Sequence, residues 1–209
     1  MAEIRQGIRH LLAAPFAYDS LQRVLGAYAW RHREILRHAV PALPQGARVL
    51  DIGCGTADIL EVIPQHARYY GFDRNERYIV HARNRFRGRQ AIFVCDDFSG
   101  ATQAGGERFD LILALGLLHH LDDKEVSALM EIAKSALTDN GAMITLDPVR
   151  TPDQSAMARY LVDHDRGQNV RSPTEYARLA RAVFQTVEMF LDPAPLWVPY
   201  TGVTLRCSR

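Results

Sequence analysis

The sequence lacks several features that would place a protein in a class at once. It has no run of about eighteen apolar residues, so we expect no membrane span. It has only three cysteines, Cys54, Cys95 and Cys207, and no two of them are spaced as zinc ligands are. Neither a disulfide framework nor structural zinc is therefore expected, and a reducing, cytoplasmic location is predicted.

The chain also lacks an excess of charge of either sign. Its formal net charge is +1 over 209 residues, which excludes a global field favouring nucleic acid or an anionic membrane. Arginines gather in the stretch 74–89, around a predicted surface helix and without an array of aromatic side chains for base stacking. We therefore interpret this stretch as a solvated face and predict no nucleic-acid partner.

What the sequence does have is an alternation of strand and helix patterns after a helical start. Residues 1–45 predict helices that form an N-terminal cap, and residues 46–209 predict one α/β core. Expected strands are 47–52, 68–72, 91–95, 110–115, 142–147, 186–191 and 201–207, with helices at 57–63, 75–87, 123–137 and 173–184. Such alternation predicts a mostly parallel sheet with helices on both faces.

Two short patterns predict where the helix at 123–137 begins and how the chain turns from it into the next strand. Asp122 precedes the helix at 123–137, and Glu125 follows three residues later, which predicts a capping box. Asp139-Asn140-Gly141 predicts a turn into the next strand.

The segment from Arg48 to Asp58 is the most informative part of the chain. An apolar strand runs into Gly53 and Gly55, a pattern that predicts a tight strand-to-helix turn with bare backbone amides for the anionic end of a cofactor. A dinucleotide turn has Gly or Ala where this chain has Asp58, and an acid there would repel a diphosphate. Asp51, at the strand end, suits a cofactor with a positive charge.

The run Asp51-Ile52-Gly53-Cys54-Gly55-Thr56-Ala57 resembles the first motif of class I S-adenosylmethionine-dependent methyltransferases, Asp/Glu-x-Gly-x-Gly-x-Gly. Ala57 replaces the third glycine, which costs little at negative φ and is strained at positive φ. The resemblance covers roughly 47–147 and is to the small-molecule, bacterial type. It implies a Rossmann-like seven-stranded sheet whose last strand is antiparallel, with S-adenosyl-L-methionine as cofactor and S-adenosylhomocysteine as product.

Ligands of open α/β sheets bind at the carboxyl ends of the strands. Asp73 ends the second strand and can accept both ribose hydroxyls. By resemblance Asp97, rather than Asp96, accepts from the adenine amine while Phe98 covers the ring, and the end of the fourth strand meets the methionine portion. The expected cofactor-binding residues are Asp51, Gly53, Cys54, Gly55, Asp73, Arg74, Asp97, Phe98 and Leu115.

His119 and His120 follow the fourth strand, near the expected methyl position. A general base is needed only if the nucleophile carries a proton that cannot leave by itself. Because adjacent residues in a turn seldom face the same way, we predict His119 as the catalytic base and place His120 with the substrate. The alternative is that one or both histidines cap the loop or pack beneath it.

The segment after the fifth strand suggests the nature of the substrate. Arg150, Arg166 and Arg171 carry guanidinium groups that could bind a carboxylate or phosphate in bidentate fashion, and a salt-bridged connector is the alternative. Tyr18 and Tyr200 complete the predicted substrate set. Asp147 invites a metal, but no Asp-Asn pair accompanies it, so we predict no metal.

The function we predict is transfer of a methyl group to an O, N or C atom of a small, possibly anionic molecule. Three alternatives stay open: non-methylation chemistry with the same cofactor, a non-catalytic partner subunit, and an NAD-dependent oxidoreductase, which Asp58 disfavours. RNA or protein methylation is disfavoured because Gly116-Leu117-Leu118-His119 stands where an Asn-Pro-Pro-Tyr or Asp-Pro-Pro-Tyr motif would be. The Pro-rich stretch 192–199 is either a homodimer contact or a pocket wall.

Overall fold

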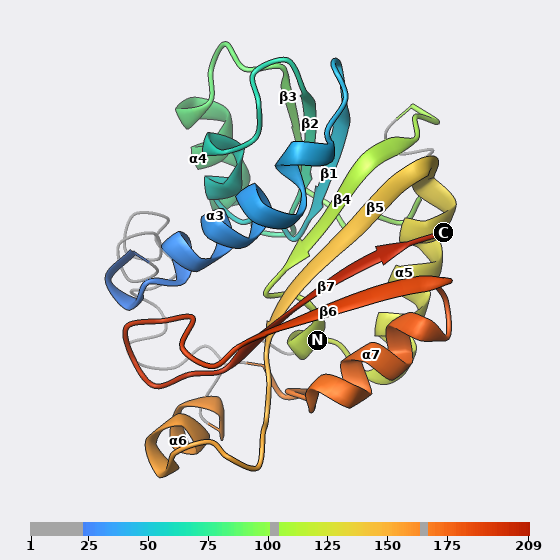
Figure 1. Cartoon of the computed structure of the whole chain (residues 1–209). Helices are drawn as coiled ribbons and strands as arrows, with labels where there is room; N and C mark the ends of the chain where they lie inside the picture. The colour runs from blue at the N-terminus through green and yellow to red at the C-terminus, as the bar shows by residue number, and fades with distance from the viewer. Residues whose placement is uncertain (1–22, 101–104, 164–166) are drawn as a thin grey trace.

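A seven-stranded sheet forms the centre of the molecule, with the strand order β3-β2-β1-β4-β5-β7-β6 (Figure 1). The computed structural model describes residues 23–100, 105–163 and 167–209. The strands are β1 (Arg48–Ile52), β2 (Arg68–Phe72), β3 (Ala91–Val94), β4 (Phe109–Leu115), β5 (Leu137–Pro148), β6 (Thr186–Asp192) and β7 (Gly202–Ser208). The predicted seven-stranded sheet is confirmed.

Strands β1 to β5 are parallel, and β7 runs antiparallel to both β5 and β6. Asp51 of β1 lies level with Gly71 of β2 and Leu113 of β4. The carboxyl ends of these strands therefore meet at one edge of the sheet, where the sequence places its polar residues. The order reverses between β1 and β4, which makes that edge the expected ligand site.

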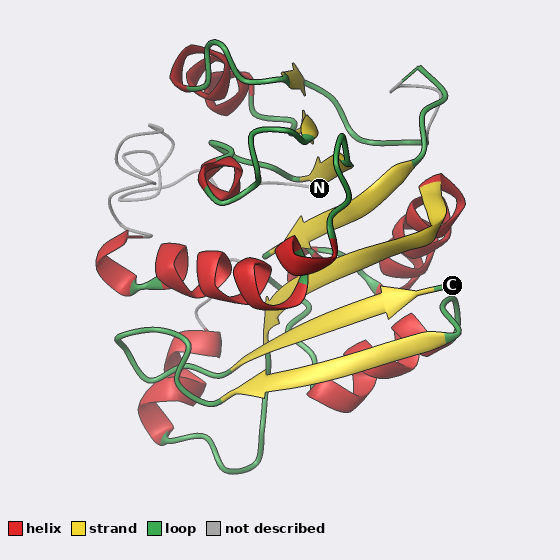
Figure 2. Cartoon of the chain, turned by 45° about the horizontal axis from the view of Figure 1, so that its top comes forward, coloured by secondary structure: helices red, strands yellow, loops and turns green. Residues whose placement is uncertain are grey.

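Helices cover both faces of the sheet, as Figure 2 shows most clearly. On one face α3 (Ala27–His38) and α4 (Glu76–Arg85) pack over a buried cluster that includes Ile35, Val49 and Ile79. On the other face α5 (Asp123–Ala136) and α7 (Pro173–Arg181) cover a cluster that includes Ile112 and Met130. The predicted two-faced α/β architecture is therefore confirmed.

Two short elements differ from expectation. The helix expected at 57–63 is only a 3₁₀ turn, η2 (Asp58–Glu61), because Pro64 disfavours helical geometry in the residue before it. The segment after β5, expected as a connector, contains the helix α6 (Ala156–Asp163).

The turn expected at Asp139-Asn140-Gly141 is wrong. β5 begins at Leu137, directly after α5, and pairs with Phe109 before its register shifts. A Cβ on Gly141 would lie 2.7 Å from the Phe109 carbonyl oxygen, so the glycine lets the two backbones approach closely at this irregularity. The capping box is confirmed, because Asp122 accepts from the Glu125 amide and Glu125 accepts from the Asp122 amide.

The described part of the predicted N-terminal cap is α3 with the short 3₁₀ turn η1 (Val40–Ala42). Helix α3 packs on the sheet itself: a Cβ on Gly202 of β7 would lie 2.1 Å from Cη2 of Trp30. Tyr18 lies outside the described residues. A division at residue 45 into cap and core stays a prediction.

Three further observations concern the described parts of the molecule. No helix there has both the length and the apolar character needed to cross a bilayer. Cys54, Cys95 and Cys207 are free thiols. Within residues 23–100, 105–163 and 167–209, no group of three His, Cys, Asp or Glu side chains is arranged to hold a metal ion.

Candidate functional site

The turn after β1 is built on positive φ angles. Gly53 has φ 76° and Gly55 has φ 56°, conformations that glycine adopts without a Cβ penalty. Ala57, with φ 58°, is the single non-glycine residue in the described ranges with positive φ, so the third position of the motif is strained. A Cβ on Gly53 would lie 3.3 Å from Cδ1 of Leu117, which shows that this turn touches the loop after β4.

The backbone amides of this turn are not bare, contrary to expectation. The N–H groups of Gly53 and Cys54 donate to the Phe72 carbonyl at 2.8 and 3.0 Å. The N–H of Gly55 donates to Oδ2 of Asp73 at 2.8 Å. The pairing of β1 with β2 continues past both strand ends, and it uses the donors that the sequence suggested for a ligand.

Asp73 stands at the centre of this arrangement. Its Oδ2 accepts from Gly55, and its Oδ1 accepts from the Asn75 N–H at 2.7 Å. Each carboxylate oxygen can accept more than one hydrogen bond. The turn therefore fixes the Asp73 side chain in one orientation, and its contact with the hydroxyls of a ribose stays a prediction.

Asp51 and Cys54 lie beneath the turn rather than on it. The Asp51 carboxylate is 3% exposed, and its Oδ2 accepts from the Tyr69 hydroxyl at 2.5 Å. Burial raises the pKa of Asp51 to about 7, although the Tyr69 hydrogen bond opposes the rise. The Cys54 thiol is also buried, against Gly71, and burial raises its pKa well above the ordinary value.

Arg74 and Asp97 form an exposed two-pronged ion pair at the ends of β2 and β3. Any donor that Asp97 accepts from must therefore share the carboxylate with Arg74. The Phe98 ring is 5% exposed and packs edge-on against Phe72 in the core, with the ring centroids 5.2 Å apart. The ring thus lies beneath the sheet edge, and its predicted contact with adenine has no support in this packing.

Asp58 has a structural partner that the sequence did not reveal. Its Oδ2 accepts from Nη2 of Arg31 at 2.7 Å, and its carbonyl lies 3.2 Å from Nε2 of His32. Helix α3 therefore neutralises the acid and is fastened to the start of η2. The expectation that Asp58 repels a diphosphate is weakened, since the charge is compensated.

His119 lies in η4 (Leu118–His120), the 3₁₀ turn after β4, and is 6% exposed. Its Nδ1 is 2.8 Å from Oδ1 of Asp147, which also accepts the His119 backbone N–H at 3.1 Å. Asp147 is 1% exposed, and among the described residues its Oδ2 has no hydrogen-bond partner. A buried carboxylate thus orients the imidazole through Nδ1, and the catalytic role expected of His119 stays a prediction.

The segment that follows α6 packs closely against the His119 ring. A Cβ on Gly167 would lie 2.0 Å from Cδ2 of His119 and 2.7 Å from its carbonyl oxygen. No side chain fits at residue 167 unless His119 moves. The ring of His120 lies only 4.0 Å from that of His119 between centroids, so the two rings are neighbours rather than turned apart.

The anion-binding role expected of Arg171 stays a prediction, and the packing of its side chain does not favour it. Its side chain is 8% exposed, and its guanidinium donates to Asp123 and to three backbone carbonyls. Arg150 is half-exposed and pairs with Asp163. Arg166, like Tyr18, falls outside the described residues, so its substrate role stays a prediction.

The roles expected of Tyr200 and Leu115 stay predictions, and the structure shows where each residue lies. Tyr200 is half-buried and precedes Thr201, whose carbonyl accepts from the Val149 N–H at 3.0 Å beside the end of β5. Leu115 is the last residue of β4. The structure thus brings the ends of β1, β2, β4 and β5 together around Asp73 and His119.

Two residues that form the site were missed by the sequence argument. Asp147 was considered only as a metal ligand, although its place at the end of β5 was a signal of the same kind as Asp73. Gly167 gave no signal, because its close approach to His119 joins residues that are far apart in the chain.

A family model described as "Methyltransferase domain" matches residues 24–183, which is more than half of the chain. The chain belongs to this family, the class I S-adenosylmethionine-dependent methyltransferases, and S-adenosylmethionine is the cofactor.

Individual relatives are distant. The chain is 33% identical over 134 residues to the human "Probable tRNA methyltransferase 9B", covering 63% of this chain and 26% of that protein. It is 33% identical over 84 residues to "Ubiquinone biosynthesis O-methyltransferase" of Coxiella burnetii, covering 39% of this chain and 36% of that protein. The chain thus spans about a quarter to a third of the length of these relatives.

Solved structures share the fold. The pyocyanin biosynthetic protein PhzM matches with a TM-score of 0.70 at 18% identity, over 98% of this chain and 62% of that chain. The N-methyltransferase NodS from Bradyrhizobium japonicum matches with a TM-score of 0.62 at 22% identity, over 86% of this chain and 95% of that chain.

Asp73→Ala should weaken cofactor binding tenfold to a hundredfold or more. Hydrogen bonds to a charged group contribute about 1.5–3 kcal/mol each, and about 1.4 kcal/mol corresponds to a tenfold change in affinity. Calorimetric titration with S-adenosylhomocysteine measures the change. Asp139→Ala, an 89% exposed carboxylate at the opposite edge of the sheet, is the control and should leave affinity unchanged. Equal affinity in Asp73→Ala and the parent would exclude this carboxylate as a cofactor contact.

Proposed function

We propose that the protein methylates a small molecule at an atom that carries a proton, a hydroxyl oxygen or an N–H nitrogen. The observation that carries the proposal is the buried contact of 2.8 Å between Nδ1 of His119 and Oδ1 of Asp147. A nucleophile without a removable proton would need no such pair. The site therefore supports O- or N-methylation over methylation of an atom without a proton.

The residues at the sheet edge fit the cofactor. Asp73 offers acceptor lone pairs for a diol, and Gly53 leaves room for the Leu117 side chain above the turn. Asp51 lies buried below the turn, and burial raises its pKa to about 7. A charged group that binds nearby would therefore change the fraction of Asp51 that is ionised. When bound, S-adenosylmethionine supplies a methyl group made electrophilic by its sulfonium.

The chain's own residues supply alignment and proton transfer. Asp147 accepts a hydrogen bond from Nδ1–H and so fixes the tautomer in which Nε2 of His119 can take up the proton of the acceptor. The low exposure of both side chains strengthens their attraction, because little water screens it. Gly167 lies close against the His119 ring, since a Cβ there would lie 2.0 Å from Cδ2 of His119.

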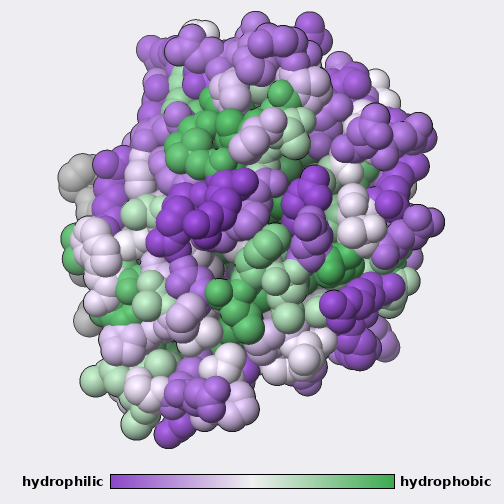
Figure 3. Space-filling model, in the orientation of Figure 1, coloured by the Kyte–Doolittle hydropathy of each residue, from purple (hydrophilic) through white to green (hydrophobic). Residues whose placement is uncertain are grey.

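A second candidate acceptor is a nucleoside in tRNA, favoured by relatives whose names describe tRNA methyltransferases. The charges of the protein do not favour it. Most arginines of the 74–89 stretch have partners within the chain: Arg74 with Asp97, Arg83 with the Phe93 carbonyl, Arg85 with Glu61, Arg87 with Asn84, and Arg89 with the Ile63 carbonyl. Figure 3 shows hydrophilic and apolar patches interspersed over the face that it displays.

The test is incubation with methyl-labelled S-adenosylmethionine and two acceptor pools: a nuclease-treated, low-mass metabolite extract and bulk tRNA. We expect label in the low-mass pool, with S-adenosylhomocysteine formed in equal amount. Label in tRNA alone would replace this proposal by the second candidate. Binding of the cofactor without transfer to either pool would support the non-catalytic alternative.

A further inference from the structure

Residues 167–171 join the η4 turn, which carries His119, to the end of β5, which carries Asp147. The N–H of Asn169 donates to the His119 carbonyl at 2.9 Å. The N–H of Arg150, which follows β5, donates to the Arg171 carbonyl at 3.0 Å. One segment thus contacts the backbone after β4 and the backbone after β5.

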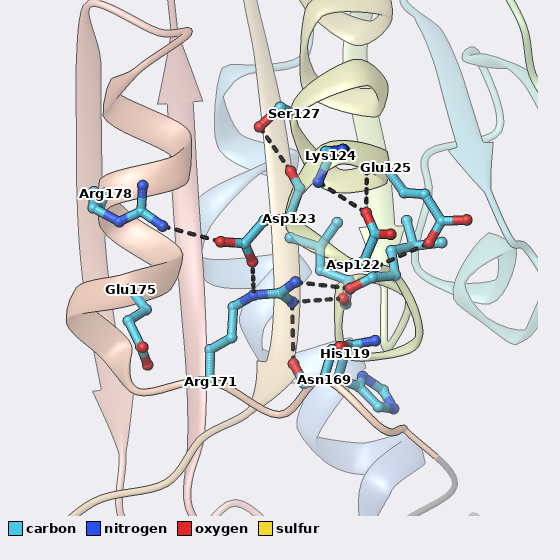
Figure 4. Close-up of polar contacts among 12 residues, drawn as sticks. His119, Asp122, Asp123, Lys124, Glu125, Ser127, Asn169, Arg171, Glu175 and Arg178 are labelled. Atoms are coloured by element: carbon cyan, nitrogen blue, oxygen red, sulfur yellow. Dashed lines mark hydrogen bonds and ion pairs between the residues drawn. The ribbon is translucent and has the colours of Figure 1, made fainter.

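Arg171 adds a second layer of contacts to this bridge (Figure 4). Its Nη1 donates to the carbonyls of Leu118 and Asn169, each at 3.0 Å, and its Nη2 donates to the Leu121 carbonyl at 2.8 Å. Its Nε donates to Oδ1 of Asp123 at 2.8 Å. Four hydrogen bonds thus tie the guanidinium to its neighbours, and the Arg171 side chain is 8% exposed.

Two of the carbonyls that Arg171 contacts lie on either side of His119 in the chain. Leu118 and Leu121 flank His119 in sequence, and the Leu121 N–H already donates to the Leu118 carbonyl at 3.1 Å. The guanidinium therefore joins both ends of the turn that carries the histidine. A lysine ammonium is a compact charge without the planar fork, so it cannot span the same set of acceptors.

We propose that Arg171 is a positioning residue for His119: it holds the η4 turn so that the imidazole stays aligned with Asp147, while touching neither substrate nor cofactor. The proposal rests on the proposed role of His119 as a base. It explains why a buried arginine lies against the predicted catalytic loop with its donors directed to that loop's backbone.

The test compares Arg171→Lys with Arg178→Ala. Arg178 donates to the other oxygen of the same Asp123, at 3.1 Å, and is 64% exposed. Its loss removes a charge from the same ion-pair cluster without touching the carbonyls of the turn. We expect Arg171→Lys to lower kcat tenfold to a hundredfold with cofactor affinity within threefold of the parent, and Arg178→Ala to keep kcat within twofold.

A spectroscopic readout separates positioning from general damage. In the full chain with ¹⁵N-labelled histidine, the Nδ1–H resonance of His119 reports its hydrogen bond to Asp147, and Asp147→Asn supplies the spectrum of the broken bond. We expect Arg171→Lys to move this resonance towards that of Asp147→Asn and Arg178→Ala to leave it in place. An unchanged resonance and unchanged kcat in Arg171→Lys would overturn the proposal.

Two further outcomes are decisive. If Arg171→Lys does not fold, Asp123→Asn loosens the same guanidinium while leaving its carbonyl bonds, and the resonance should move in the same direction by a smaller amount; no movement overturns the proposal. If His119→Asn keeps full kcat, the base role fails, and the resonance in Arg171→Lys still decides whether Arg171 positions the ring.

Discussion

His119→Asn should lower kcat by about a hundredfold to ten-thousandfold, the usual contribution of a positioned general base. The cofactor contacts proposed for Asp73 lie on a different strand end, so the affinity for S-adenosylhomocysteine should stay within threefold. Asp147→Asn should lower kcat by a similar factor, because an amide nitrogen offered to Nδ1 would favour the wrong tautomer. Steady-state kinetics with the acceptor found in the labelling assay measure both effects.

His66→Gln is the control for the loss of an imidazole, since His66 lies in the loop before β2, at the opposite edge of the sheet. It should leave kcat unchanged. Full activity of His119→Asn across the pH range would show that the acceptor loses its proton without this residue.

Asp51→Asn should make the protein more stable, and increasingly so as pH rises. Burial raises the folded-state pKa of Asp51 to about 7, while the unfolded chain ionises this group near pH 4. Between these values the folded state binds the extra proton, so the free energy of unfolding contributed by Asp51 falls as pH rises and levels off above the folded pKa. The whole penalty is on the order of 4 kcal/mol, because each pKa unit corresponds to about 1.4 kcal/mol.

Denaturant unfolding of the parent and of Asp51→Asn at pH 5 and pH 8 measures this penalty. The stability advantage of the variant should be about 2–3 kcal/mol larger at the higher pH. An asparagine oxygen can still accept from Tyr69, so the hydrogen bond at 2.5 Å is retained in kind. An advantage that is equal at both pH values would mean that Asp51 is ionised in the folded protein throughout this range.

The sequence predicted the order and type of the main elements because their signals are local. The strand ending in Asp51 and the helix capped by Asp122 each rest on apolar periodicity and on residues close by in the chain. The structure confirms all seven strands and the antiparallel direction of β7. The predictions failed where a contact between residues far apart in the chain outweighs the local pattern. At Leu137, for example, pairing with Phe109 replaces the expected turn.

The candidate site was predicted in part for the same reason. Parallel strands end at one edge of the sheet, so Asp73 and His119 could be placed near one another from the strand pattern alone. Which backbone N–H groups of the turn donate hydrogen bonds within the protein, however, depends on the approach of Phe72 and Asp73 from the next strand.

The sequence by itself determined the class of the protein: an α/β fold, a glycine turn after β1, and acids at successive strand ends, all of which follow from short-range patterns. Tertiary structure alone decided which side chains are hydrogen-bond and ion-pair partners. It paired Asp58 with Arg31, directed the Arg171 guanidinium to the Leu118 carbonyl beside His119, and set Asp147 against His119. Hydrogen bonds and ion pairs act over a few ångströms in space, and the distance between two residues along the chain does not reveal that separation.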